Sequence, residues 1–166
     1  FVECEPADWF KKSEEFDNEI RSRFLETYEA IVAGETAEWR RSAKGRLAEI
    51  IVLDQFSRNM FRDDAKAFAS DAFAVELAKE AMSLWDEFSI QERSFVVMPF
   101  MHSESLAVHD WAVKWFDEPG LERRKKYELM HREIIERFGR YPHRNRVLGR
   151  TSTPEEEAFL KEHQGF

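Results

Sequence analysis

The sequence has 166 residues, a length that suits one domain with one hydrophobic core. Hydrophobic residues make up 43% of it and aromatic residues 14%, while six Gly and five Pro are too few for an all-β chain with many tight turns. The net charge of −8 disfavours nucleic-acid binding, and no apolar run approaches the ~20 residues of a membrane span.

The single Cys4 cannot form an internal disulfide, and no Cys spacing typical of a zinc site is present. No signal peptide is visible, although a chain that begins at Phe1 rather than Met gives this absence little weight. We therefore expect a cytoplasmic protein with no membrane partner. The sequence also contains no Walker loop, no Rossmann glycine pattern and no His-Glu-x-x-His motif, so we expect neither a cofactor nor a metal.

Regularly spaced apolar residues predict an all-α fold of roughly seven helices, mostly linked as antiparallel hairpins in a single domain over residues 1–166. Ser13 is the expected N-cap of the first helix, and Gly34 is its expected stop. Thr36 is expected to cap a second helix over about 37–54 or beyond. Because the connection between these helices is short, they should form an antiparallel hairpin.

The third and fourth helices are predicted from equally local signals. Ser70 or Asp71 should begin the third helix. Ser89 and Glu92 have the spacing of a capping box at the start of the fourth helix, which Pro99 should interrupt and keep short.

Three further helices complete the predicted fold. The fifth should run from about 100 to 116, and apolar groups on two of its sides predict a central position. The sixth, near 121–138, should end at Gly139, and it carries His131 on its apolar stripe, where a hydrogen-bonded core histidine is expected. Thr153-Pro154 should open a last short helix, with a cap followed by Pro at the first position.

The sharpest conflict with a simple buried helix lies at Asp54 and Arg58. At about 100° per residue, both continue the apolar stripe that residues 47–51 begin. A charge on a core-facing stripe must be paired or hydrogen-bonded, because desolvating it alone is costly. The two residues therefore form either a buried ion pair or an anion site. In the second case Arg58, with Arg62 one turn further on, would bind the anion while Asp54 orients it.

A second candidate site is the segment Pro99-Phe-Met-His-Ser-Glu104. On a regular helix His102 and Glu104 point about 200° apart, so they would share a ligand only if the segment after Pro99 is not yet helical. His102 is a candidate general base, and a satisfied core histidine is the plainer alternative. Glu104, on the face of Trp111 and Trp115, should have a raised pKa or an Arg partner.

The third candidate is a long basic loop at residues 139–152. Its possible donors include Arg140, His143, Arg144, Asn145 and Arg150. Residues 123–150 hold ten Lys or Arg and three acids, so this segment carries +7 and the rest of the chain −15. Such a basic segment indicates either an anionic partner or an internal acidic surface with which it pairs. The loop is accordingly either a binding element or a solvated surface loop.

Several blocks of the sequence are distinctive: Trp9-Phe10 with Phe16-Asp17, Leu53-Asp-Gln-Phe-Ser-Arg-Asn59, Pro99-Phe-Met-His-Ser-Glu104, and Arg137-Phe-Gly-Arg-Tyr-Pro-His-Arg-Asn145 followed by Leu148-Gly-Arg150 and Ser152-Thr-Pro-Glu-Glu156. In this order they resemble a mainly bacterial family, domain-of-unknown-function family 924, over nearly the whole chain. The family pattern usually has Pro where this chain has Ser57. The resemblance implies a fold similar to tetratricopeptide-like helical repeats, in a right-handed superhelix, and no established activity. Its recurring residues map onto Asp54, Gln55, Arg58, Asn59, His102, Glu104, His143, Arg144 and Asn145.

Three functional hypotheses follow from these observations. The preferred one is a helical-repeat binding protein with a pocket for an anionic small molecule or a peptide carboxylate. The second is an enzyme of hydrolase type, with His102 as base and Asp54 or Glu104 as its partner. The third is a purely structural polar network, with a protein-interaction surface elsewhere. The predicted ligand-binding residues are Asp54, Gln55, Arg58, Asn59, Arg62, His102, Glu104, His143, Arg144, Asn145 and Arg150.

Overall fold

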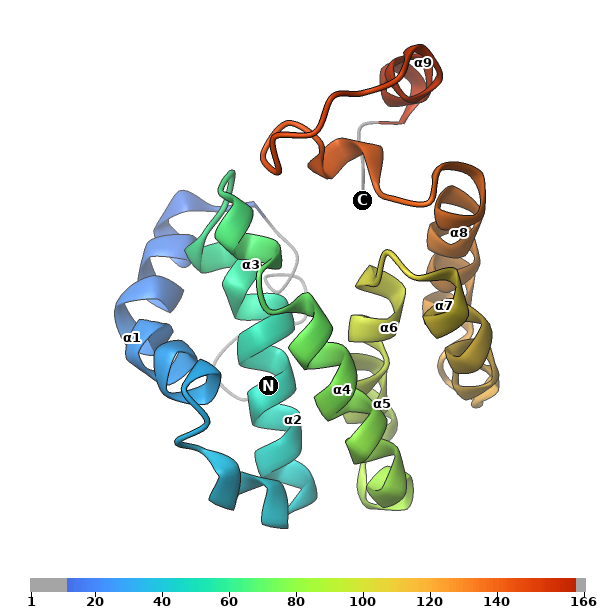
Figure 1. Cartoon of the computed structure of the whole chain (residues 1–166). Coiled ribbons are helices and arrows are strands. Elements are labelled where there is room, and N and C mark those ends of the chain that lie inside the picture. The colour runs from blue at the N-terminus through green and yellow to red at the C-terminus, as the bar shows by residue number, and fades with distance from the viewer. Residues whose placement is uncertain (1–11, 164–166) are drawn as a thin grey trace.

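The computed structural model describes residues 12–163, so the predicted aromatic pair Trp9-Phe10 lies outside the described residues. All regular structure within 12–163 is helical, as predicted, and consecutive helical turns join into seven main segments (Figure 1). The elements are α1 (Glu14–Val32), η1 (Ala37–Arg41), α2 (Ala43–Ile51), η2 (Val52–Phe56), α3 (Ser57–Met60), η3 (Ala65–Phe68), α4 (Asp71–Ala81), η4 (Met82–Glu87), α5 (Ile90–Val96), α6 (Met98–His102), α7 (Leu106–Ala112), η5 (Val113–Asp117), α8 (Glu122–Phe138), η6 (Pro142–Arg144) and α9 (Pro154–Glu162).

Most helix ends lie where local sequence signals predict them. The Ser13 hydroxyl accepts a hydrogen bond from the Phe16 amide at the start of α1. Ser89 begins α5 and Thr153 begins α9, each with a complete capping box. Gly139 ends α8 at a φ of 68°, a left-handed conformation that favours glycine. These ends are specified locally, because a cap needs only residues within one turn of it.

The prediction that Thr36 caps the second helix is wrong. Residues Ala37–Arg41 form only a 3₁₀ turn, and α2 begins at Ala43 with Ser42 as its cap. Thr36 instead donates its hydroxyl hydrogen to the buried carboxylate of Glu49, at 2.6 Å. A tertiary hydrogen bond therefore takes the side chain that the sequence pattern assigns to a cap.

The prediction of one continuous helix over 100–116 is also wrong. Helix α6 ends at His102, residues 103–105 form a bend, and α7 begins at Leu106. The Ser103 carbonyl accepts a hydrogen bond from Nε2 of His109, at 2.9 Å, and the Glu104 side chain binds elsewhere. These contacts stabilise the non-helical conformation of residues 103–105, so Glu104 lies in a connector instead of on a helical face.

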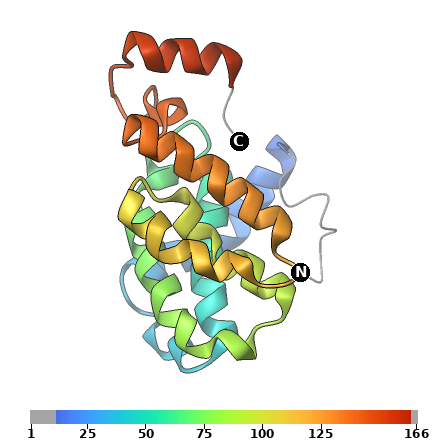
Figure 2. The ribbon, with the colours of Figure 1, turned by 90° about the vertical axis from the view of Figure 1, so that its right-hand side faces the viewer.

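The core lies where the central helices meet. Helices α2, η2 and α3 form one continuous segment. The C-terminal part of this segment, η2 and α3, packs against α1, and its N-terminal part, α2 and η2, packs against α4. Helix α4 also packs against α6, which in turn contacts α8, and the two views show α8 running across α6 and α7 (Figures 1 and 2). Leu53, Ala78 and Phe100 are completely buried in this core.

Two further features of the fold bear on function. Within residues 12–163, no helix combines the length and apolar character needed to cross a bilayer. The right-handed superhelix implied by the family resemblance stays a prediction. What positions the candidate site is the junction of η2, the start of α4, the end of α6 and the loop after α8.

Candidate functional site

Asp54 lies in η2, a π-helical turn within an otherwise α-helical segment. Such wide turns are rare and occur frequently at functional sites. The Asp54 side chain is only 1% exposed. His102 Nδ1 lies 2.7 Å from Oδ1, and the Gln55 amide donates to Oδ2 at 2.5 Å. The structure thus brings together residues 54, 55 and 102, which the sequence analysis selected from two separate segments.

The Asp54 carboxylate is stabilised in its ionised form. Burial by itself raises the pKa of Asp54, but the charges of His102 and Arg58, with the hydrogen bonds from His102 and Gln55, outweigh burial. Together they lower the pKa of Asp54 to about 2. The ionised carboxylate accepts hydrogen bonds only, so Nδ1 of His102 is the donor and carries the hydrogen.

His102 keeps one ring nitrogen uncommitted. It is the last residue of α6, and its side chain is 17% exposed. Its Nδ1 bond to Asp54 fixes the tautomer, which leaves a lone pair on Nε2. Within the described part of the chain, Nε2 makes no hydrogen bond. A carboxylate that orients an imidazole in this way is the arrangement used in general-base catalysis.

Arg58 does not pair mainly with Asp54, from which its Nη2 lies 3.8 Å away. It binds Asp71 through both terminal nitrogens, at 2.8 and 3.0 Å. Arg144 donates from Nη1 to the same carboxylate at 2.9 Å and from Nη2 to the His102 carbonyl at 2.9 Å. Asp71 therefore joins two arginines from distant segments. The sequence analysis missed this role, since the only local signal was an acid at the start of α4.

Glu104 is paired away from His102. Arg150 donates to its two oxygens at 2.7 and 2.9 Å, and the Tyr141 amide donates at 2.8 Å. Burial raises the pKa of Glu104, but the hydrogen bonds from Arg150 and Tyr141 and the nearby Arg charges lower it overall. The expected Arg partner is thus present, and it is Arg150 from the basic loop.

The other predicted residues do not contact Asp54, His102 or Asp71 directly. Asn59 and Arg62 both bind Asp17 on α1, at 2.7 Å and 2.5 Å respectively. Asn145 is buried, and it donates to Ser152, just before α9, at 3.0 Å and to Glu156 on α9 at 3.3 Å. His143 is exposed beside the Tyr141 ring, whose centroid is 5.6 Å away.

A second carboxylate–histidine pair was not predicted. His109 and Glu128 are both fully buried, with Nδ1 2.7 Å from Oε1. Here Nε2 of His109 is occupied by the Ser103 carbonyl, so this pair is closed and ties α7 to α8. His131 is a hydrogen-bonded core histidine, as predicted, and donates from Nδ1 to the Tyr127 carbonyl at 2.7 Å. No set of three or more His, Cys, Asp or Glu side chains within 12–163 is arranged to bind a metal.

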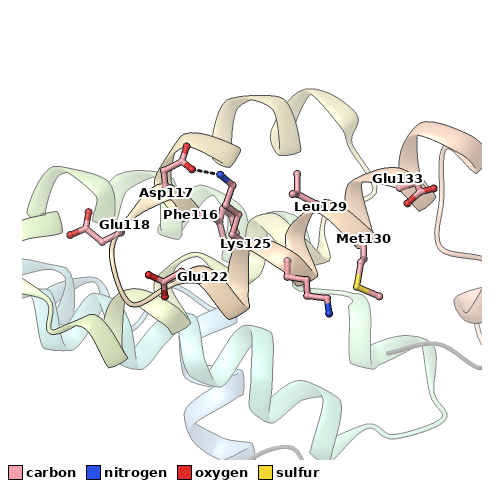
Figure 3. A pocket seen from close by; sticks show the side chains of 9 residues that line it. Phe116, Asp117, Glu118, Glu122, Lys125, Leu129, Met130 and Glu133 are labelled. Carbon is pink, nitrogen blue, oxygen red and sulfur yellow. Dashed lines mark hydrogen bonds and ion pairs between the residues drawn. The ribbon is translucent and has the colours of Figure 1, made fainter.

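Two of the hollows on the surface of residues 12–163 bear on the candidate site. One, of about 470 Å³, lies between η3, the start of α4, the 103–105 bend and the basic loop, and Glu104 and Arg144 are among its lining residues. The other, of about 540 Å³, lies beside η5 and α8 and contains none of the predicted residues (Figure 3). An ion pair between Lys125 and Asp117 crosses part of its wall (Figure 3). Of these two, the first adjoins the ion pair between Asp71 and Arg144.

Residues 2–164 match the family described as bacterial protein of unknown function, DUF924. The chain belongs to this family. A solved structure of a protein of unknown function from Agrobacterium tumefaciens is similar to this DUF924 chain, with 37% sequence identity and a TM-score of 0.87. The similarity covers 95% of this chain and 90% of the other. None of the curated proteins matches the chain significantly.

The arrangement in this DUF924 chain divides into two chemical parts. The arginines predicted to bind an anion are each bound to a carboxylate: Arg58 and Arg144 to Asp71, Arg62 to Asp17, and Arg150 to Glu104. An anionic ligand would have to compete with these carboxylates. The Asp54–His102 pair differs, because it ends in a nitrogen with a free lone pair.

Proposed function

We propose that this chain is an enzyme of hydrolytic type, in which His102 is the general base and Asp54 orients it. The observation that carries the proposal is the 2.7 Å contact between Nδ1 and the Asp54 carboxylate, with Nε2 left unbonded. In the reaction, Nε2 would take a proton from a water molecule as the water oxygen bonds to the acyl carbon or phosphorus of the substrate, and the imidazolium would give that proton to the leaving group as the bond to it breaks. Asp54, ionised and held by Gln55, would stabilise the imidazolium that forms.

Supporting features surround the pair. The π-helical turn that carries Asp54 and the bend after His102 are both irregular, and both are held by tertiary contacts. Arg144 fixes the His102 backbone through its carbonyl, so the imidazole is anchored at both its main chain and its ring. Anchoring of this kind is what a catalytic base needs, because its geometry must already be set when substrate binds.

The test uses p-nitrophenyl acetate, p-nitrophenyl butyrate and p-nitrophenyl phosphate as probes of hydrolysis by the purified chain. We expect one of them to be hydrolysed, and His102→Gln to lower kcat/KM by about 100-fold or more, the usual contribution of a general base. Asp54→Asn should also lower the rate, because an amide can present its hydrogen to Nδ1 and favour the wrong tautomer. His163→Gln, an exposed histidine on the C-terminal side of α9, is the matched control.

Failure has a clear form. If none of the three probes is turned over, or if His102→Gln hydrolyses them as fast as the unchanged protein, the hydrolytic proposal is wrong. The structural hypothesis would then account for the pair, with the additional result that His102→Gln lowers stability without any effect on a rate.

Binding of an anionic small molecule or a peptide carboxylate is the second candidate function. The observation that favours it is the guanidinium of Arg144 in the wall of the 470 Å³ hollow. Its bond to Asp71 weakens the case, because a bound anion would have to displace a buried carboxylate. Arg144→Gln should abolish binding of acetate or benzoate if this candidate is correct.

A further inference from the structure

The His109–Glu128 pair holds one hydrogen more than a neutral histidine beside an ionised carboxylate would. Nε2 of His109 lies 2.9 Å from the Ser103 carbonyl, which only accepts hydrogen bonds, so Nε2 carries a hydrogen. In a neutral imidazole Nδ1 would then be a bare acceptor, and an ionised Glu128 also only accepts. Their 2.7 Å contact therefore requires a second hydrogen between Nδ1 and Oε1. The pair is either an imidazolium with a carboxylate or an imidazole with a carboxylic acid, and in both forms its net charge is zero.

The surroundings of the pair offer no substitute for this second hydrogen. Both side chains are completely buried, and within residues 12–163 Glu128 forms no ion pair with a lysine or an arginine. Its other oxygen, Oε2, is buried and has no hydrogen-bond partner among the described residues. If the hydrogen left, a buried carboxylate would face the Nδ1 lone pair without a counter-charge, which is costly in a protein interior. Loss of the hydrogen should therefore drive the two side chains apart.

The titratable groups around the pair keep their charge state on the alkaline side of neutrality. From the loop after α8, the Tyr141 hydroxyl lies 3.4 Å from Nε2 of His109, and it donates to the Met101 carbonyl of α6 at 2.6 Å. Burial raises the pKa of Tyr141 above its ordinary value, so this phenol stays neutral. On α8, burial lowers the pKa of His131 to about 3, so its ring is already neutral. In the bend, Glu104 is ionised, because its hydrogen bonds lower its pKa. An alkaline transition at this place would therefore belong to the pair itself.

The pair also holds the bend that follows His102. The hydrogen on Nε2 of His109 is bound to the carbonyl of Ser103, the residue directly after His102. Two further contacts hold His102, one through its ring and one through its own carbonyl. A rotation of the His109 ring away from Glu128 would release the Ser103 carbonyl and remove one of these three restraints. A change in the buried pair is thus one peptide away from the backbone of His102.

We propose that the His109–Glu128 pair is a proton-operated latch, closed while it holds its second hydrogen and opened when alkaline pH transfers that hydrogen to solvent. In the closed state α7 and α8 are tied together and the bend at residues 103–105 is fixed. In the open state the bend loses its contact with His109, and His102 loses part of its anchoring. The effect on catalysis rests on the proposed hydrolytic function, whereas the latch is a property of the fold and is measured without any substrate.

NMR of the isotopically labelled full chain tests the latch directly. Ring-nitrogen chemical shifts distinguish a protonated nitrogen from a bare one, and the carboxyl carbon shift reports whether Glu128 is ionised. At about pH 7 we expect either His109 protonated on both nitrogens or Glu128 protonated. As the pH rises to about 10, the pair should lose one proton, and the amides of residues 103–109 should shift with the same midpoint. The protection factors of these amides against hydrogen exchange should fall at least about tenfold over this range.

Glu128→Gln separates the latch from other effects of alkali. The glutamine amide can donate its own hydrogen to Nδ1 of a neutral His109, so the contact no longer depends on a proton that titrates. We expect this variant to stay closed up to about pH 10, with protection factors at residues 103–109 that change less than about twofold. Glu133→Gln, which changes an exposed acid on the same helix, is the matched control and should keep the pH response of the unchanged protein.

Hydrolysis of a p-nitrophenyl probe gives a second readout. After subtraction of the uncatalysed rate, kcat/KM of the unchanged protein should fall at least about tenfold above the midpoint of the latch, because the anchoring of His102 is weakened. Glu128→Gln should remove this alkaline decline, and a decline that persists in the variant would refute the regulatory role of the latch. Absence of hydrolysis would refute the catalytic proposal alone, since the NMR measurements decide the latch.

Three NMR results would overturn the latch itself. The first is a bare Nδ1 on His109 beside an ionised Glu128 at about pH 7. The second is a set of amides at residues 103–109 that does not change up to about pH 10. The third is a folded Glu128→Gln variant whose bend responds to alkali as the unchanged protein does. The first two are measured on the unchanged protein, so they decide the question even if Glu128→Gln does not fold.

Discussion

Replacing Asp71 with Asn should destabilise the protein by about 3 kcal/mol, because this carboxylate neutralises two arginines at once. It accepts hydrogen bonds of 2.8 and 3.0 Å from Arg58 and 2.9 Å from Arg144. Removing one partner from a buried ion pair costs about 3–5 kcal/mol. Asp71 is 15% exposed and Asn keeps one acceptor oxygen, so the lower end of that range applies.

Urea unfolding followed by tryptophan fluorescence would measure the change, since five Trp report on the transition. A loss of about 3 kcal/mol corresponds to a fall in Tm of about 6–12 °C for a chain of this length. The double variant Asp71→Asn with Arg144→Met should lose less than the sum of the two single variants, with a coupling of about 1–3 kcal/mol, because it leaves one fewer unpaired buried charge.

Glu19→Gln is the control, because its partner Arg23 is a single turn away and both side chains are about half exposed. It should change the free energy of unfolding by less than about 0.5 kcal/mol. If Asp71→Asn were as mild as this control, or if the double variant were simply additive, the reasoning that Asp71 bridges two buried charges would be refuted.

Two further predictions concern pH and glycine. Burial, with the charge on His102 adding to it, lowers the pKa of His131 to about 3. Because this pKa is lower in the folded protein than in the unfolded chain, the stability that neutral His131 contributes is complete above about pH 6.5 and is lost as the pH falls. Between about pH 6 and 4.5 this should give a slope near 1.4 kcal/mol per pH unit, which His131→Gln should reduce in pH-dependent urea unfolding, and an unchanged slope would contradict the assignment. Gly45→Ala should cost more than about 3 kcal/mol, because its Cβ would lie 1.9 Å from the Trp39 carbonyl oxygen. Gly139→Ala meets no atom within 4 Å, so the strain of a φ of 68° should cost only about 1–2 kcal/mol; thermal unfolding would give the order, and the reverse order would refute the packing argument.

The features that sequence could predict are those determined within one or two turns. Ser13, the Ser89–Glu92 box and Gly139 act on neighbouring backbone groups, so their spacing alone was sufficient. The prediction that Thr36 caps a helix failed because its hydroxyl has a better partner, Glu49, thirteen residues away in sequence. The prediction of a continuous helix through residues 103–105 failed for a related reason. Its carbonyl and carboxylate are bound by side chains from elsewhere, and no residue within the bend signals this.

The candidate site shows the same division. Asp54 and Arg58 were conspicuous because charges on a buried stripe need partners, and both have them. Which partners they have depends on three-dimensional arrangement: His102 for one and Asp71 for the other. Asp71 itself has the appearance of an ordinary first-turn acid, whose placement near a helix N-terminus already has a local explanation. Because an acid in the first turn of a helix already has a local explanation, the sequence does not indicate that Asp71 also binds Arg58 and Arg144.

The wide turn at Val52–Phe56 makes the length of this segment as important as its composition. It holds one residue more than a regular α-helical turn would, and each residue in a helix advances the direction of all later side chains by about 100°. Deleting one residue there would restore regular hydrogen bonds, but it would rotate Arg58 away from Asp71 and Asn59 away from Asp17 in a single step. A change of one in the residue count of this segment would therefore disconnect α3 from both α1 and α4.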